Sequence, residues 1–212
     1  RVALYEKSDK LGGHVIEASV PSFKKDEVRL LDWYKTELDE LHVETNLGIE
    51  VSLELVREEK PDAVIVATGS KPIILGVPGI KKEKVTTAAD LLLGKKEAGG
   101  SVVIIGGGLI GCETALWLAQ QGKRVTVVEM LDSLMHAGNP VPRPNRMVLL
   151  DLLKFHKVNV LTNTSLLEVI DDGAVLIDKS SHRSVLPAET VVLSAGLESE
   201  RVLYRSLMGK IP

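Results

Sequence analysis

The chain has 212 residues, of which 44% are hydrophobic and 26% are charged, with a formal net charge of -3. This is the composition of a globular protein, and a prior of roughly 150 residues per domain predicts one or two domains. Aromatic residues make up only 3% and basic residues are not in excess, which argues against a nucleic-acid partner. The single cysteine excludes an intramolecular disulfide and a cysteine-based metal site, so we expect no metal.

Strand and helix signals alternate along most of the chain, which predicts an α/β fold with a parallel sheet. Short apolar runs predict buried strands over residues 1–6, 62–68, 101–106, 124–129 and 190–195.

Helical spacing of apolar residues predicts helices over 25–41, 109–121 and 146–156. Residues 158–188 alternate as an antiparallel meander does, and the prolines within 136–144 predict a loop there. No run of about 20 apolar residues is present, so we expect a cytoplasmic protein without a membrane partner.

The strongest chemical signal is a glycine-rich turn between the predicted strand 101–106 and the predicted helix 109–121. It reads G-x-G-x-x-G, with glycines at 106, 108 and 111. Gly106 permits the tight turn, Gly108 lets a pyrophosphate approach the backbone, and Gly111 lets the helix pack on the strand. The turn therefore predicts a dinucleotide site at the start of the helix, with a ligand-free packing turn as the alternative.

An acidic residue ends the next predicted strand. Glu129 follows Gly111 by 18 positions, where a carboxylate can accept hydrogen bonds from both hydroxyls of an adenosine ribose. A carboxylate there repels a 2′-phosphate, which predicts NADH rather than NADPH. Two alternatives remain open: Glu129 is a solvated strand-end acid, or Arg143 and Arg146 turn toward a 2′-phosphate.

The first residues repeat the second half of this pattern. A predicted strand ends in Glu6, and Leu11-Gly12-Gly13 follows, but no glycine turn precedes the strand. If Glu6 binds a ribose, about 25 residues with a phosphate loop should come before Arg1. An exposed acid at the end of a strand is the alternative.

Four ordered motifs resemble those of two-dinucleotide flavoproteins, the FAD-dependent pyridine nucleotide-disulphide oxidoreductase superfamily. They are Glu6-Lys7-x-x-x-Leu11-Gly12-Gly13, Asp62 to Pro72, the turn 106–111, and Val191 to Gly196. The segment 11–34 is most similar to the carboxyl-terminal half of old yellow enzyme-like NADH:flavin oxidoreductases. These are the 2,4-dienoyl-CoA reductase, enoate reductase and NADH oxidase group, to which trimethylamine dehydrogenase is related.

The resemblance covers essentially the whole chain and implies a Rossmann-like fold in which an NAD(P)H-binding domain is inserted into an FAD-binding domain. It implies a partial FAD domain over 1–84 without its first strand and glycine turn, and an NAD(P)H domain over 85–197. Residues 198–212 would begin the return to the FAD domain, so the FAD site is expected to be cut at both ends.

The resemblance also implies cofactor contacts. Those with NAD would come from Gly106, Gly107, Gly108, Leu109, Ile110, Gly111 and Glu129, with Ala195 and Gly196 near the nicotinamide. Those with FAD would come from Glu6, Lys7, Gly12, Gly13, Val51, Ala67, Thr68 and Gly69. Glu113 matches an acid near the nicotinamide and is the candidate catalytic residue, although an acid in the first turn of a helix also favours the helix dipole.

The function implied is that of an NADH-dependent flavoprotein reductase, in fragment form and inactive alone. NADH would pass hydride to FAD, and electrons would continue through a 4Fe-4S cluster to FMN in an upstream barrel of the same parent chain, which reduces an enoate or dienoyl substrate. A static ADP-binding module and a glutamate synthase small-subunit-like electron-input module are the alternatives.

Two further expectations concern chemistry and assembly. His14 stands where disulfide reductases of the superfamily carry a redox cysteine pair, which excludes disulfide chemistry, and Cys112 is expected to be a buried packing residue. Unpaired strand edges within 1–84 would allow a homo-dimer.

Overall fold

The structure, a computed structural model, describes residues 1–138 and 140–210, and these form two compact units. The first unit comprises residues 1–19, 24–71 and the segment from Glu198 onward. The second unit comprises residues 20–23 and 72–197.

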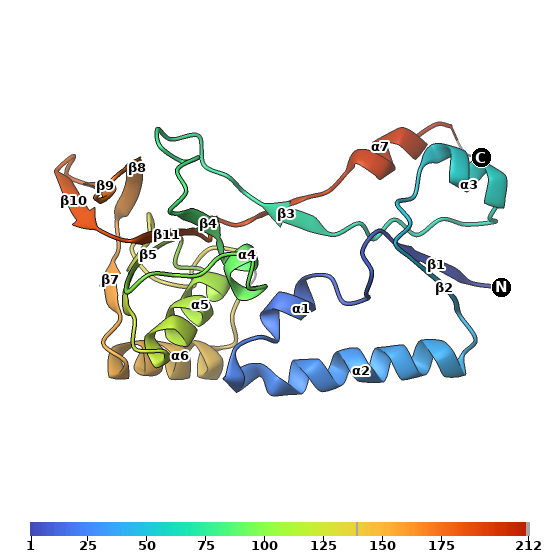
Figure 1. Cartoon of the computed structure of the whole chain (residues 1–212), viewed down its shortest axis with the longest axis horizontal. Helices are drawn as coiled ribbons and strands as arrows, with labels where there is room; N and C mark the ends of the chain where they lie inside the picture. Colours follow the sequence, from blue (N-terminus) through green and yellow to red (C-terminus); the bar gives the residue numbers. More distant parts are fainter. Residues whose placement is uncertain (139, 211–212) are drawn as a thin grey trace. The chain divides into compact units, whose positions relative to one another are not determined.

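The second unit is built on a five-stranded parallel sheet in the order β4-β11-β5-β6-β7. Figure 1 labels β4, β5, β7 and β11 of this sheet. Its strands are β4 (Val85–Thr87), β5 (Ser101–Ile105), β6 (Arg124–Val128), β7 (Asn159–Leu161) and β11 (Thr190–Leu193). The central strands are buried on both faces, which explains why their sequences are continuous apolar runs.

Helices cover one face of this sheet and an antiparallel meander covers the other. The helices are α4 (Ala88–Leu92), α5 (Leu109–Gln120) and α6 (Arg143–Phe155), and the meander is β8 (Thr164–Ile170), β9 (Gly173–Asp178) and β10 (Arg183–Pro187). Val102 and Ile104 pack against the helices, whereas Val103 and Ile105 pack against the meander. This division follows from the period of two residues in a strand.

Within its described residues, the first unit has a two-stranded parallel sheet and four α-helices. The sheet pairs β1 (Ala3–Glu6) with β2 (Glu44–Leu47). The helices are α1 (His14–Ala18), α2 (Lys25–Glu40), α3 (Leu53–Glu59) and α7 (Val202–Leu207). A short 3-10 helix, η1 (Ser22–Lys24), precedes α2, and β3 (Ser70–Pro72) pairs with β12 (Leu197–Ser199) in a further two-stranded sheet.

The structure confirms the predicted α/β class and most of the predicted elements. Strands β1, β5, β6 and β11 lie within the predicted strands 1–6, 101–106, 124–129 and 190–195. Helices α2 and α5 match the predicted helices 25–41 and 109–121, and β8–β10 form the predicted meander. No helix of the described residues is long and apolar enough to span a bilayer.

The predicted strand 62–68 is wrong. Residues 62–68 belong to none of the sheets in the described chain, and the side chain of Ile65 is 92% exposed. The sequence has the Val- and Ile-rich composition of a buried strand, but a strand forms only where a neighbouring backbone accepts and donates its hydrogen bonds. Such a neighbour is missing within the described residues.

Two predicted boundaries are also wrong. The helix predicted over 146–156 begins at Arg143, so the predicted loop 136–144 ends at Pro142. Pro144 is accommodated because amides in the first turn of a helix have no acceptor within the helix. Residues 159–161, predicted as part of the meander, instead form β7 at the edge of the parallel sheet.

Candidate dinucleotide-binding site

The candidate site lies at the carboxyl edge of the five-stranded sheet. The glycine turn follows β5, Glu129 follows β6, and Ala195 and Gly196 come soon after β11. Since β6 and β11 flank β5 in parallel, the ends of these strands meet at one edge. The chain leaves β5 for β6 on one side and places β11 on the other, and such a switch point is where α/β sheets bind ligands.

Two of the glycines are required by the fold itself. Gly106 has φ +108, and a Cβ atom there would lie 2.2 Å from the backbone oxygen of Ser194. A Cβ on Gly111 would lie 2.0 Å from the backbone oxygen of Gly106. The turn therefore packs backbone against backbone, which only residues without a side chain permit.

Gly108 differs from both. Its φ is -69, and a Cβ atom there would have no protein atom within 4 Å. Gly108 is the N-cap of α5, and no side chain caps this helix end. The first amides of the helix have no acceptor within the helix, so they are available to an anion. The open space and the uncapped amides together fit a pyrophosphate.

The side chain of Glu129 is buried, with 6% exposed. Its Oε2 accepts a hydrogen bond of 2.7 Å from the Gly107 amide, and its Oε1 accepts one of 2.8 Å from the Leu131 amide. The alternative of a solvated strand-end acid is therefore wrong. Each carboxylate oxygen has a second lone pair, so a ribose hydroxyl can still be bound.

The bond between Glu129 and Gly107 is a feature that the sequence motif did not reveal. A Cβ on Gly107 would lie 2.3 Å from Cδ2 of Leu134 and 3.1 Å from Cβ of Glu129. The one available signal was the unbroken run of three glycines, because the motif itself leaves position 107 free.

The two arginines that could serve NADPH have different surroundings. Arg146 donates to the Leu134 carbonyl through Nε at 3.2 Å and Nη2 at 3.0 Å. Arg143 is exposed at the first position of α6. Arg146 is thus engaged by the protein, and Arg143 is left as the alternative cation for a 2′-phosphate.

The residues predicted near the nicotinamide come from α5 and from the end of β11. Glu113 is half-buried in the second turn of α5, and the first turn of this helix contains no acidic residue, so the alternative of a first-turn acid is wrong. Gly196 has φ +106, and its carbonyl accepts a hydrogen bond of 3.0 Å from the Ile73 amide. Ala195 is half-buried beside it. The roles of these residues toward a nicotinamide stay predictions.

The predicted FAD residues lie in the first unit. Oε1 of Glu6 accepts hydrogen bonds from the amide and hydroxyl of Ser8, at 2.8 and 2.9 Å. The Ile49 amide donates to the Glu6 carbonyl at 3.0 Å, which brings the segment before Val51 close to the end of β1. Lys7 follows Glu6 and is exposed.

His14 connects the predicted FAD residues Gly12 and Gly13 with the predicted FAD segment Ala67–Gly69. Nε2 of His14 lies 3.0 Å from both the carbonyl and the hydroxyl oxygen of Ser70. This contact brings Gly12 and Gly13, which precede α1, close to the segment Ala67–Gly69. A Cβ on Gly12 would clash with the side chains of α1 and α2, whereas Gly13, at φ +48, has open space around it.

Cys112 is fully buried, which confirms its predicted packing role. Its thiol lies 3.4 Å from the Gly107 carbonyl. Burial, together with the nearby carboxylates of Glu129 and Glu113, raises the pKa of the Cys112 thiol to about 12. The thiol is therefore protonated at neutral pH and is no nucleophile.

We expect Cys112 of the native chain to react with Ellman's reagent at pH 8 far more slowly than in the urea-unfolded chain. The unfolded thiol ionises near pH 8.5, and the folded one near pH 12. Because the folded pKa is raised, the stabilisation is complete below about pH 8.5 and is lost as the pH rises toward 12. Cys112→Ala should remove this part of the pH dependence of unfolding. Rapid native labelling would contradict the burial.

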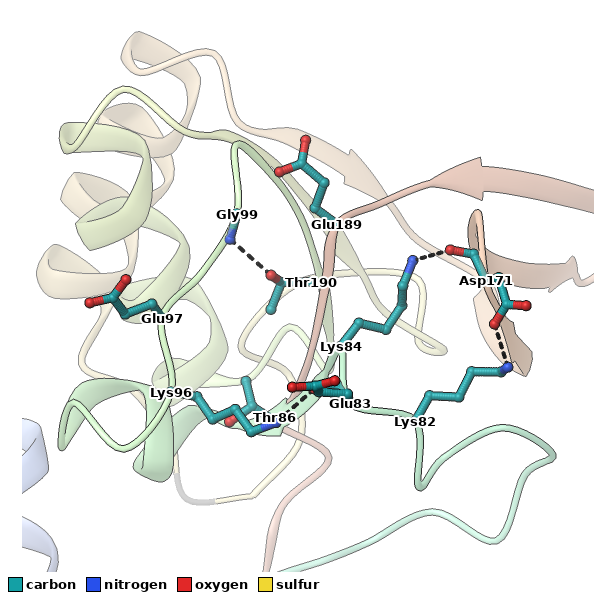
Figure 2. Close-up of a pocket in the computed structure, with 10 residues that line it drawn as sticks. All are labelled: Lys82, Glu83, Lys84, Thr86, Lys96, Glu97, Gly99, Asp171, Glu189 and Thr190. Atoms are coloured by element: carbon teal, nitrogen blue, oxygen red, sulfur yellow. Dashed lines mark hydrogen bonds and ion pairs between the residues drawn. The ribbon is translucent and has the colours of Figure 1, made fainter.

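A cavity lies elsewhere in the second unit, where β4, β5 and β11 begin. It has a volume of about 510 Å³ and is lined by charged side chains and Thr190 among others (Figure 2). Lys82 pairs with Asp171 and lowers the pKa of that carboxyl, while Lys84 donates to the carbonyls of Asp171 and Ala188. Lys82 and Lys84 are thus bound to other groups of the protein. The cavity also lies at the edge of the sheet opposite the carboxyl ends of the strands, which is where α/β sheets generally bind ligands.

Comparison with known proteins gives a consistent set of relatives. The sequence profile of the pyridine nucleotide-disulphide oxidoreductase family matches residues 16–210. Cinnamate reductase of Clostridium sporogenes is 41% identical over 212 residues, covering 100% of this chain and 31% of the reductase. Metal reductase of Desulforamulus reducens is 33% identical over 244 residues, covering 100% and 36%. The chain thus spans about a third of the length of these curated relatives.

Solved structures give the same result. A complex of 2-naphthoyl-CoA reductase with 2-naphthoyl-CoA has a TM-score of 0.89 at 30% identity, covering 97% of this chain and 31% of that one. Histamine dehydrogenase from Rhizobium sp. 4-9 has a TM-score of 0.81 at 20% identity, covering 99% and 34%. The second likeness concerns the fold alone.

Proposed function

Because this chain belongs to the pyridine nucleotide-disulphide oxidoreductase family, whose enzymes use FAD and NAD(P)H, we propose that it binds NADH and serves hydride transfer from NADH to FAD. The observation that carries the proposal is the open space at Gly108 beside the uncapped start of α5 and the buried carboxylate of Glu129.

The proposed division of labour follows the ranges expected from the sequence. Residues 85–197 form the NADH-binding domain, residues 1–84 part of the FAD-binding domain, and residues 198–212 the start of the return to it. The bound cofactors supply the redox chemistry, with NADH as hydride donor and FAD as acceptor.

The protein's own task is to bind and orient the cofactors. The amides of Leu109, Ile110 and Gly111 face the pyrophosphate, and Gly108 leaves room for it. Glu129 accepts from the ribose hydroxyls while it braces Gly107. Glu113, Ala195 and Gly196 border the nicotinamide. On the FAD side, the contacts are Glu6, Lys7, Gly12, Gly13, Val51, Ala67, Thr68 and Gly69.

For the whole protein we propose an NADH-dependent reductase of an enoate or dienoyl substrate. Electrons would leave FAD for an upstream barrel of the same chain, which holds FMN and a 4Fe-4S cluster. Support comes from the similarity to a cinnamate reductase, since cinnamate is an enoate, and from relatives about three times as long as this chain.

Calorimetry tests the binding step. We expect NADH to bind the chain at least about tenfold more tightly than NADPH, because the Glu129 carboxylate repels a 2′-phosphate. Equal affinities or a preference for NADPH would overturn the role of Glu129. ADP binding as tightly as NADH would favour a static adenine-nucleotide module, and anaerobic reduction of FAD by NADH in the longer protein would count against that module.

The purified chain is expected to carry less than one FAD per molecule. Residues 62–68 belong to none of the sheets of the described residues, so strand pairing does not hold Ala67 and Thr68 in place. The contacts of this segment are hydrogen bonds with Glu200, from the Thr68 hydroxyl to its carbonyl at 2.8 Å and from its amide to the Gly69 carbonyl at 2.9 Å. The ratio of flavin released by denaturation to protein measures the outcome, and the same chain incubated with added FAD is the control. A stoichiometric yellow preparation would show that the first unit already contains a complete FAD site.

A further inference from the structure

The loop between β6 and α6 lies directly against the glycine turn. Leu134 and Met135 in this loop are each 5% exposed and belong to the core cluster that includes Cys112, Leu149 and Leu153. The Leu134 side chain occupies the space where a side chain on Gly107 would be. The conformation of this loop therefore affects the turn that the dinucleotide is proposed to contact.

Both backbone polar groups of Gly107 are hydrogen-bonded. Its amide donates to Oε2 of Glu129 at 2.7 Å, and its carbonyl accepts a hydrogen bond of 2.8 Å from the Met135 amide. Met135 has φ +55, a left-handed conformation that a residue with a side chain adopts only where its surroundings enforce it.

Arg146 is the polar group that holds the residue before Met135. Its Nε and Nη2 both donate to the Leu134 carbonyl, at 3.2 and 3.0 Å. Arg146 is the fourth residue of α6, at the end of its first turn, and that helix is fixed to the core through Leu149 and Leu153. A guanidinium group offers two N–H donors to one acceptor in a rigid geometry, which suits it to orient a peptide group.

We propose that Arg146 is a positioning residue of the dinucleotide site. It fixes the Leu134 carbonyl, the adjoining Met135 amide then holds the Gly107 carbonyl, and the glycine turn is kept in the conformation that receives a pyrophosphate. The proposal rests on the proposed function, and it assigns Arg146 no contact with the cofactor.

The test compares Arg146→Met with Lys154→Met, which removes one positive charge from an exposed site on the same helix. Calorimetry with NADH and with NADPH should show both affinities falling by about tenfold in Arg146→Met, with their ratio unchanged. Lys154→Met should bind as the unaltered chain does. Arg146→Lys, which keeps an N–H donor, should recover part of the loss.

Hydrogen exchange at the Met135 amide, followed by NMR without nucleotide, gives a readout independent of binding. Exchange should be faster in Arg146→Met and unchanged in Lys154→Met. A selective loss of NADPH affinity would instead make Arg146 a phosphate ligand, and unchanged NADH affinity or unchanged Met135 exchange would overturn the positioning role. Absence of NADH binding in the unaltered chain, with Met135 exchange still dependent on Arg146, would refute the proposed function rather than the contact.

Discussion

Replacing Gly108 with alanine is expected to lower NADH affinity by roughly 100-fold or more, equivalent to about 2.7 kcal/mol, and to leave the fold intact. A methyl group there meets no protein atom within 4 Å, and the φ of -69 suits any residue. It would, however, occupy the space into which we propose that the pyrophosphate fits. Calorimetry with NADH and urea unfolding of the same preparation measure the two effects.

Gly106→Ala is the matched control for Gly108→Ala. It adds the same methyl group to the same turn, but at φ +108 and 2.2 Å from the Ser194 carbonyl oxygen. We expect it to lower the free energy of unfolding by more than about 2 kcal/mol, whereas Gly108→Ala should change it by less than about 1 kcal/mol. If Gly108→Ala destabilises the chain as much, Gly108 is required by the fold and its openness carries no information about a ligand.

The contrast between these two glycines shows what a motif can predict. The pattern G-x-G-x-x-G and the strand and helix around it are local features, and the structure places them as expected. The division of roles between Gly106 and Gly108 depends on Ser194, which is 88 positions further along the chain. The pairing of β5 with β11 brings Ser194 next to Gly106.

The same reasoning explains the wrong strand. Residues 62–68 and 101–105 have similar Val- and Ile-rich sequences, so side-chain pattern alone predicts a strand in both places. Residues 101–105 have β6 and β11 as neighbours, whereas residues 62–68 have none among the described residues. Sequence pattern reports which faces a strand could bury, but the partner that makes it a strand is a property of the tertiary fold.

Hydrogen bonds between groups that are distant in the sequence could not be predicted, for a related reason. Glu129 was predicted from its place at the end of a strand, but its bond to Gly107 crosses from β6 to the turn after β5. From its sequence position, Arg146 is expected only as a phosphate ligand, because its actual partner, the Leu134 carbonyl, belongs to the backbone. Backbone acceptors carry no sequence signal, since every residue has one.

Glu129→Gln is expected to weaken both the fold and the nucleotide site. The carboxylate accepts from the buried amide of Gly107 and from the partly buried amide of Leu131. A glutamine side chain has one acceptor oxygen and an NH₂ group that only donates, so one amide loses its partner. An unsatisfied buried donor costs about 1–3 kcal/mol, and we expect a loss of that size in the free energy of unfolding.

The same substitution should lower NADH affinity by at least about tenfold and bring the affinities for NADH and NADPH closer together, because the charge that repels a 2′-phosphate is gone. Glu97→Gln is the control, since it makes the same change at an exposed site that lines the cavity at the opposite edge of the sheet. Urea unfolding and calorimetry with both nucleotides separate the two roles. A loss of stability with an unchanged NADH to NADPH ratio would leave Glu129 as a brace for the glycine turn alone. A changed ratio with unchanged stability would leave it as a ribose ligand alone. If Glu129 has both roles, the substitution must lower the free energy of unfolding and also change the ratio of the two affinities.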